Sequence, residues 1–298
     1  HPHNKISKIQ RKIMTTIGGK NIYNIAINGS FDDCQKIVKH MFADNLFRQS
    51  INMSGVNSIN WARIIFQIVY YFYSFFRSEN KKINFSVPTG NFGDIYAGYM
   101  AKKMGLPIEK LIVATNENDI LQRVINKGIY KPSKVKASIS PSMDIQVSSN
   151  FERLLFYVLK SRDIEVKKLM NSLETKGYFK LTEAQKKIIQ KDFAAFKVTN
   201  NETKKVIKKI YRQNKFFVDP HTATAFYAAS KIKTNYPCVI LGTAHPYKFL
   251  ETMRAVTGKK IKKPSQLSKL IAGKERYDIL NNNTNIIKKY ILEKYYEN

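Results

Sequence analysis

The segment from Phe85 to Thr115 constrains the fold more than any other part of this chain. Residues 85–88 form a short run that ends in proline, which is typical of a strand that enters a loop. Residues 94–105 carry apolar side chains at helical spacing and end in glycine. Residues 110–115 contain Leu-Ile-Val-Ala and predict a buried strand. This order predicts a βαβ unit, in which two parallel strands are joined by a right-handed crossover.

Two glycines bound the turn between the first strand and the helix. Gly90 and Gly93 accept φ values that other residues resist, so the backbone amides of the turn can converge on an anion. The N-terminus of the following helix would add its partial positive charge. The pattern Gly-Asn-Phe-Gly is neither a Walker loop nor a dinucleotide fingerprint. A tight turn without a ligand explains it equally well, and the rest of the chain has to decide.

Composition excludes several classes of protein. The 298 residues are 43% apolar and 12% aromatic, which predicts a globular fold with a large core. The longest apolar stretch, residues 64–76, is shorter than the ~18 residues of a membrane span, so we predict a buried helix there and no membrane partner. Cys34 and Cys238 lie far apart, and no signal sequence precedes them, which favours a reducing, cytoplasmic location. The five histidines form no metal-binding pattern.

The formal net charge of +29 raises the question of a nucleic-acid partner. About four lysines occur for each arginine, whereas base and phosphate recognition favours the planar arginine fork. Lysine is also abundant together with Asn, Ile and Tyr, as expected from an AT-rich coding sequence. We therefore attribute the charge to composition and expect no nucleic-acid partner.

The chain alternates between strand and helix patterns, which predicts an α/β fold. A strand is expected at residues 21–26, an aromatic-rich helix at 61–76 and a mainly helical region at 150–215. Another buried strand, residues 237–242, ends at Thr243-Ala-His245-Pro. Open α/β sheets bind ligands at the carboxyl ends of their strands, so this end is a candidate site.

Eight blocks of sequence carry a resemblance to a known family. They are Arg11–Thr16, Gly29–Cys34, Asn57–Arg63, Pro88–Asp94, Ala114–Asp119, Ser140–Ile145 with Ser148–Arg153, Asp219–Ala223 and Gly242–Pro246. In this order they resemble threonine synthase, a pyridoxal-phosphate (PLP) enzyme of fold type II, and the resemblance reaches about Val256. It implies a tryptophan synthase β-like α/β fold with a mostly parallel sheet flanked by helices.

The resemblance also implies roles for particular residues. The cofactor phosphate would be held by Gly90, Asn91, Phe92, Gly93 and Asp94. Thr243 would place a hydroxyl against the pyridine nitrogen. Asn60 and Arg63 would bind the substrate's phosphate, for which the arginine fork is suited, with Asn57 and Ser58 as neighbours. From the residues alone, Arg63 reads as a surface or capping residue and Thr243 equally well as a strand cap. Asp219, His221 and His245 are predicted to be structural.

The implied reaction converts O-phosphohomoserine and water to threonine and phosphate, with PLP as cofactor, in a monomer or homodimer. The family's Schiff-base lysine matches no residue here. Lys191 and Lys197 lack its surroundings, so we expect that lysine to lie outside this chain. We accordingly expect residues 1–56 to be the remnant of an N-terminal, small α/β portion and residues 57–298 to form the large PLP-binding domain. The alternatives are an inactive fragment that binds phosphorylated ligands and another fold type II PLP lyase.

Overall fold

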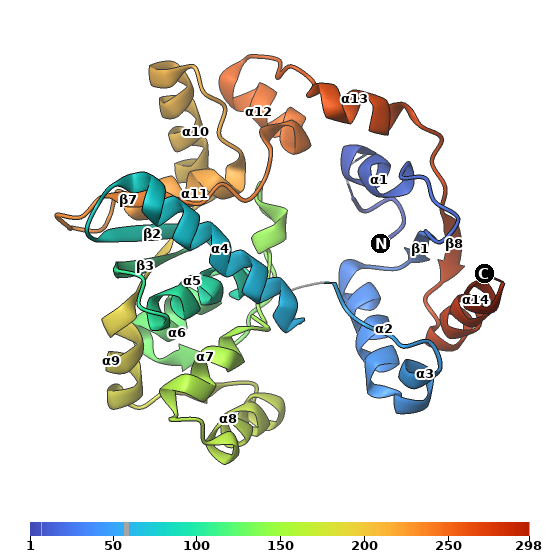
Figure 1. Ribbon diagram of the computed structural model, residues 1–298, viewed down its shortest axis with the longest axis horizontal. Helices are drawn as coiled ribbons and strands as arrows, with labels where there is room; N and C mark the ends of the chain where they lie inside the picture. Colours follow the sequence, from blue (N-terminus) through green and yellow to red (C-terminus); the bar gives the residue numbers. More distant parts are fainter. Residues whose placement is uncertain (7, 57–59, 298) are drawn as a thin grey trace. The chain divides into compact units, whose positions relative to one another are not determined.

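The computed structural model describes residues 1–6, 8–56 and 60–297 (Figure 1). These residues divide into two compact units. One unit comprises residues 1–55 together with 262–298, and the other comprises residues 56–261. The division differs from the predicted one, because the C-terminal segment belongs with the N-terminal residues and not with the large domain.

The smaller unit is built on the pairing of two distant strands. β1 (Ile25–Asn28) lies parallel to β8 (Asp278–Asn281), which joins the two ends of the chain in one sheet. β1 begins four residues later than the predicted strand, and β8 was not predicted. Its helices are α1 (Lys8–Thr15), α2 (Phe31–Ala43), α3 (Asn45–Ser50), α13 (Ser265–Ala272) and α14 (Thr284–Tyr296). Their core is formed by Ile27, Ile37, Met41, Phe47 and Ile287.

The larger unit contains a four-stranded parallel sheet in the order β6-β3-β2-β7. Its strands are β2 (Ile83–Pro88), β3 (Ile108–Thr115), β6 (Phe193–Lys197) and β7 (Cys238–Ile240). The unit β2–α5 (Gly93–Lys103)–β3 is the predicted βαβ arrangement. The region 150–215 is mainly helical, as predicted, but it also contains the unpredicted strand β6, because a short apolar run such as Phe-Ala-Ala-Phe does not distinguish a strand from a buried helix segment.

Both faces of this sheet are covered by helices (Figure 1). In β3, Leu111 and Val113 belong to the core shared with α5, whereas Ile112 and Ala114 pack with α11 (Pro220–Ala229). The split follows from the alternation of side chains along a strand. Further elements are α6 (Ile120–Lys127), β4 (Ile129–Tyr130), η1 (Pro141–Met143), α7 (Phe151–Val158), α8 (Asp163–Lys176), β5 (Phe179–Lys180), α9 (Glu183–Asp192), α10 (Asn200–Asn214), η2 (Pro246–Phe249) and α12 (Leu250–Thr257).

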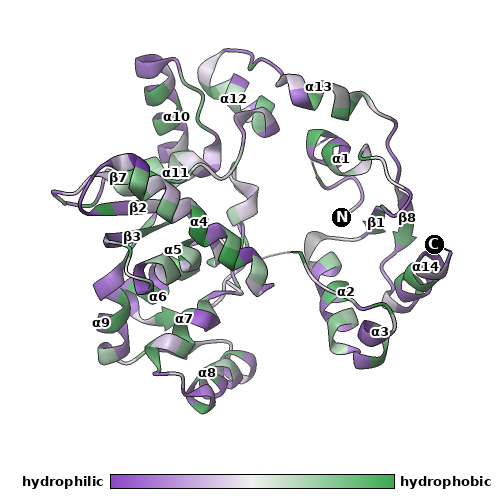
Figure 2. Ribbon diagram, in the orientation of Figure 1, coloured by the Kyte–Doolittle hydropathy of each residue, from purple (hydrophilic) through white to green (hydrophobic). Residues whose placement is uncertain are grey.

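The aromatic-rich helix α4 (Trp61–Ser78) is exposed along one side, which corrects the prediction of a buried helix. Tyr71 is fully buried against α5, but 71% of Phe66 and 70% of Phe76 is accessible to solvent. Figure 2 shows apolar residues along this helix. No helix among the described residues is long and apolar enough to cross a membrane.

Candidate functional site

The carboxyl ends of β2 and β7 form the topological switch point of the sheet. From β2 the chain continues to β3 and then β6 on one side, and it returns to β7 on the other side of β2. Ser86 lies opposite Ile240, and the Leu241 amide donates to the Ser86 carbonyl over 3.0 Å. Gly242 and Thr243 therefore leave the sheet beside the turn that follows β2. Crevices at such points bind ligands in open α/β sheets, and both sequence-predicted segments lie here.

Phe92, and not a glycine, has the unusual backbone conformation in this turn. Its φ is +65°, whereas neither Gly90 nor Gly93 has a positive φ, which corrects the expected role of the glycines. The left-handed conformation costs about 1–2 kcal/mol for a side chain. The Phe92 ring is fully buried, with its centroid 5.4 Å from that of Phe151 and 5.5 Å from that of Phe193. This packing fixes the strained residue at the start of α5.

Gly90 is required by a close approach to another segment. A Cβ atom at this position would lie 3.0 Å from Ile145 Cδ1 and 3.1 Å from both Met143 Cα and the Ser142 carbonyl oxygen. Two of these three neighbours are backbone atoms, which cannot rotate away. The glycine turn thus packs directly against the segment 142–145, which we call the wall behind Gly90.

The turn and the start of α5 present backbone donors without acceptors. Among the hydrogen bonds of the described residues, none is donated by the amides of Gly90, Phe92, Asp94 or Ile95, while the Gly93 amide donates to Asn91 Oδ1 over 2.9 Å. The first amides of a helix have no partner within it, and the helix dipole adds positive potential there. These donors fit an anionic group such as a phosphate.

Asp94 places a carboxyl group in the first turn of α5. Tyr71 donates its hydroxyl to Asp94 Oδ1 over 3.1 Å and to the Asp94 carbonyl over 2.9 Å. Burial raises the pKa of the Asp94 carboxyl to about 6, against the lowering effect of the Tyr71 hydrogen bond. Burial also raises the pKa of the Tyr71 hydroxyl, so that it stays a donor at neutral pH.

Asn150 fixes the turn at a second point. Its amide and its Nδ2 donate to the Asn91 carbonyl over 3.0 and 3.1 Å, and its side chain is 1% exposed. Arg153 Nε donates to Asn150 Oδ1 over 3.0 Å, and the Arg153 guanidinium lies 5.5 Å from the centroid of the Trp61 ring. The glycine turn is therefore connected to the N-terminus of α4. The block 148–153 gave this signal in the sequence, but no role for its residues.

The predicted substrate-binding residues lie at that N-terminus. Asn60 Oδ1 accepts from the Ala62 amide over 3.0 Å and caps α4. Arg63 is exposed, and its Nη1 donates to the Val56 carbonyl over 3.3 Å. Asn57 and Ser58 lie outside the described residues. Asn60 and Arg63 thus flank Trp61, which is linked to the turn after β2 through Arg153 and Asn150.

A buried polar network follows the carboxyl end of β3. Asn116 Nδ2 donates to Asp144 Oδ1 over 2.7 Å and to Ser138 Oγ over 2.8 Å, and Asn118 Nδ2 donates to the same carboxyl oxygen over 3.0 Å. The sequence indicated only a helix start here, and α6 does begin at Ile120. The network holds residues 138–144 near the strand end, and so supports the wall behind Gly90.

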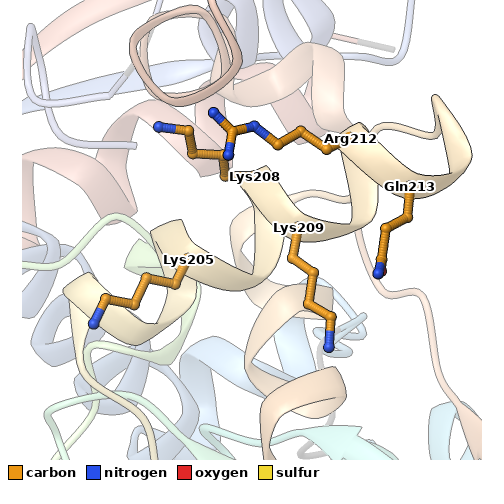
Figure 3. A pocket seen from close by; sticks show the side chains of 5 residues that line it. All are labelled: Lys205, Lys208, Lys209, Arg212 and Gln213. Atoms are coloured by element: carbon orange, nitrogen blue, oxygen red, sulfur yellow. The ribbon is translucent and has the colours of Figure 1, made fainter.

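Other charged groups lie elsewhere. A hollow of about 320 Å³ is lined by Lys205, Lys208, Lys209, Arg212 and Gln213 on α10. These side chains are all exposed and point in different directions (Figure 3). Lys197 ends β6, and its Nζ lies 3.2 Å from Asp119 Oδ2. His245 Nδ1 accepts from the Tyr247 amide over 3.1 Å, which is a structural cap. Within the described part of the chain, no three His, Cys, Asp or Glu side chains gather to bind a metal.

Comparison with known proteins identifies the class to which this fold and site belong. A family model described as "Pyridoxal-phosphate dependent enzyme" matches residues 2–243, and one described as "Threonine synthase, C-terminal" matches residues 222–291. Because the first match spans most of the chain, this chain belongs to the family of pyridoxal-phosphate-dependent enzymes.

Within that family, the chain is similar to threonine synthases. It is 45% identical to the Pseudomonas aeruginosa enzyme over 95% of its own length and 43% identical to the Saccharomyces cerevisiae enzyme over 94%. The PLP-bound threonine synthase of Brucella melitensis is similar in structure, with a TM-score of 0.93, 42% identity, and coverage of 98% of this chain and 64% of that one. These matches confirm the predicted resemblance and fold type II. The chain spans about 61% of the length of the two curated relatives.

The site fits the cofactor of the family. PLP carries a phosphate, and the unpaired amides of Gly90, Phe92, Asp94 and Ile95 form a donor set for such a group at the switch point. The predicted cofactor is confirmed by the family match. The predicted contacts of individual residues with it stay predictions.

Proposed function

We propose that this chain is part of a threonine synthase that converts O-phosphohomoserine and water to threonine and inorganic phosphate. The observation that supports this most strongly is the turn after β2, with its strained Phe92, close-packed Gly90 and unpaired amides, in a chain whose relatives are threonine synthases. The proposal favours this reaction over that of other fold type II lyases, because we do not expect those enzymes to share the block 57–63 so closely.

We further propose a division of labour among the predicted site residues. Gly90, Asn91, Phe92, Gly93 and Asp94 would hold the cofactor phosphate, chiefly through backbone amides. Thr243, which is exposed where the chain leaves β7, would face the pyridine nitrogen with its hydroxyl. PLP, when bound, supplies an electron sink for the amino-acid carbons. Arg63 and Asn60 would bind the substrate's phosphate, together with Asn57 and Ser58, and Arg63 offers the fork that matches two phosphate oxygens.

The remaining assignments are part of the same proposal. The protein would act in the cytoplasm on a small molecule, as a monomer or homodimer. A nucleic-acid role is not supported by the basic face of α10, because its exposed side chains diverge around the helix (Figure 3) and four of the five are not arginine. No lysine of this chain is assigned to the Schiff base.

The proposal is tested by titrating the chain, and the protein produced from its complete coding sequence, with PLP and O-phosphohomoserine. We expect both to bind PLP and the complete protein to release threonine and phosphate in equal amounts. Arg63→Gln should raise the KM for O-phosphohomoserine about tenfold or more, since a charge-assisted phosphate contact is lost, and should leave PLP binding unchanged. PLP binding without release of threonine by the complete protein would favour the inactive, phosphate-binding alternative. Absence of PLP binding in both would contradict the proposal.

A further inference from the structure

We propose that His221, oriented by Asp219, is a positioning residue for the cofactor-phosphate turn. This inference rests on the proposed function, because it concerns the same turn after β2. Both residues lie in the N-terminal turn of α11, on the face of the sheet opposite α5. Neither side chain is hydrogen-bonded to the turn, and they act through Ser142 in the wall at residues 142–145.

The hydrogen bonds of the imidazole define its tautomer. The Ser142 amide donates to His221 Nε2 over 3.2 Å, so Nε2 carries no hydrogen. The ring hydrogen is then on Nδ1, which lies 3.1 Å from Asp219 Oδ1 and donates to it. Asp219 Oδ1 also accepts from the His221 amide over 2.9 Å. The imidazole is thus a neutral bridge that passes from a carboxylate on α11 to a backbone amide of η1.

Burial makes this bridge rigid. His221 is 3% exposed and Asp219 is 2% exposed, and the His221 ring packs 4.9 Å from the Phe249 ring, measured between centroids. The neighbouring Thr224 Oγ1 donates to the His221 carbonyl over 2.7 Å. Ser142 itself is exposed, but the imidazole nitrogen that accepts from its amide is buried, and a buried acceptor that loses its donor costs about 1–3 kcal/mol. Ser142 is therefore held where the imidazole accepts its hydrogen.

The residue held in this way is the one against which Gly90 rests. The Ser142 carbonyl oxygen and Met143 Cα each lie 3.1 Å from the place of a Cβ on Gly90. A shift of η1 away from α11 would press the backbone of residues 142–143 against the turn or leave a gap behind it. In both cases the amides that follow β2 would lose their common direction toward the phosphate.

The same turn of α11 also borders the other half of the site. Thr222 donates its hydroxyl to Asp219 Oδ2, and its Oγ1 lies 3.9 Å from the place of a Cβ on Gly242. Gly242 directly precedes Thr243, which we expect to face the pyridine nitrogen. The Asp219 carboxylate therefore orients two side chains at the switch point. His221 holds the segment behind Gly90, which follows β2, and Thr222 lies beside Gly242, which follows β7. Ser142 and His221 belong to two of the blocks that carry the resemblance, but no local pattern predicts a contact between residues that are 79 positions apart.

Two substitutions separate the two hydrogen bonds of the ring. The carboxamide of His221→Gln can place an oxygen near the position of Nε2 and accept from the Ser142 amide. The carboxamide of His221→Asn is shorter and can replace only the Nδ1 donor to Asp219. Both variants lose the ring contact with Phe249, so each is the packing control for the other. We expect His221→Asn to weaken binding of PLP and of inorganic phosphate about tenfold and to leave binding of pyridoxal unchanged. The affinity of His221→Gln for PLP and phosphate should stay within about threefold of that of the wild type.

The outcomes are distinguishable. Equal weakening in both variants, or none in either, while the wild type binds PLP, overturns the positioning role and leaves the proposed function intact. A wild type that binds neither PLP nor phosphate overturns both. If a variant does not fold, the ¹⁵N resonances of His221 in the wild-type protein decide the matter. They should report a neutral ring protonated at Nδ1, with a shift of the Ser142 amide on phosphate addition. A ring protonated at Nε2 would overturn the proposal.

Discussion

Asp94 directly follows the glycine turn and carries a carboxyl group whose pKa burial raises to about 6. A carboxyl with a raised pKa in the folded state stabilises that state fully below its unfolded pKa, near 3.8, and this contribution is lost as the pH rises through about 6. Asp94→Asn keeps an acceptor for the Tyr71 hydroxyl but cannot ionise. We therefore expect the free energy of unfolding of Asp94→Asn to rise relative to that of the wild type between pH 4 and pH 7, by at most about 3 kcal/mol.

Urea unfolding of the two proteins at several pH values measures this difference. A variant whose stability follows the same pH dependence as the wild type would show that Asp94 does not titrate in this range. Since the substitution also removes a negative charge from the start of α5, phosphate binding at pH 7 should not decrease.

At the scale of single elements, local sequence predicted some features well and non-local pairing decided the others. The unit β2–α5–β3 was predictable because its strand, turn and helix patterns follow one another directly. β6 and β8 were not, because their own residues do not mark them as strands: the run Phe-Ala-Ala-Phe of β6 fits a buried helix equally well, and β8 is a strand through its pairing with β1. The site followed the same rule. The turn at 90–94 was found from its residues, whereas the support by Asn150 and His221 comes from segments 59 and more residues away.

The packing of α4 on α5 gives a prediction at this scale. A Cβ on Gly98 would overlap Tyr71 Cε1 and lie 2.6 Å from Tyr71 Cζ and 2.9 Å from Leu111 Cδ2. Tyr71 cannot move freely, because its hydroxyl is bonded to Asp94. We expect Gly98→Ala to lower the free energy of unfolding by about 1–3 kcal/mol, in spite of the higher helix propensity of alanine. Chemical denaturation checks this, with Gly18→Ala as control, since no atom lies within 4 Å of a Cβ there. An unchanged or raised stability would contradict the packing.

At the scale of the whole molecule, the two units are expected to depend differently on the C-terminal segment. β8 is the partner strand of β1, and Ile287 of α14 belongs to the core with Ile27, Ile37, Met41 and Phe47. A chain ending at residue 261 loses both, and each large apolar side chain uncovered costs about 1.5–3 kcal/mol. The core of residues 56–261 is composed of its own residues.

Hydrogen exchange on the shortened chain, compared with the complete one, tests this dependence. We expect the amides of β1 and α2 to lose protection, because their core and their strand partner are removed. The amides of β2 and β3, which lie in the middle of the four-stranded sheet, should keep it, and inorganic phosphate should bind with unchanged affinity. Loss of protection in β2 and β3 would mean that the two units fold as one. Protection retained in β1 would mean that residues 1–55 hold this strand without β8, through the core around Ile27 and the hydrogen bonds between Ile27 and residues 1–3.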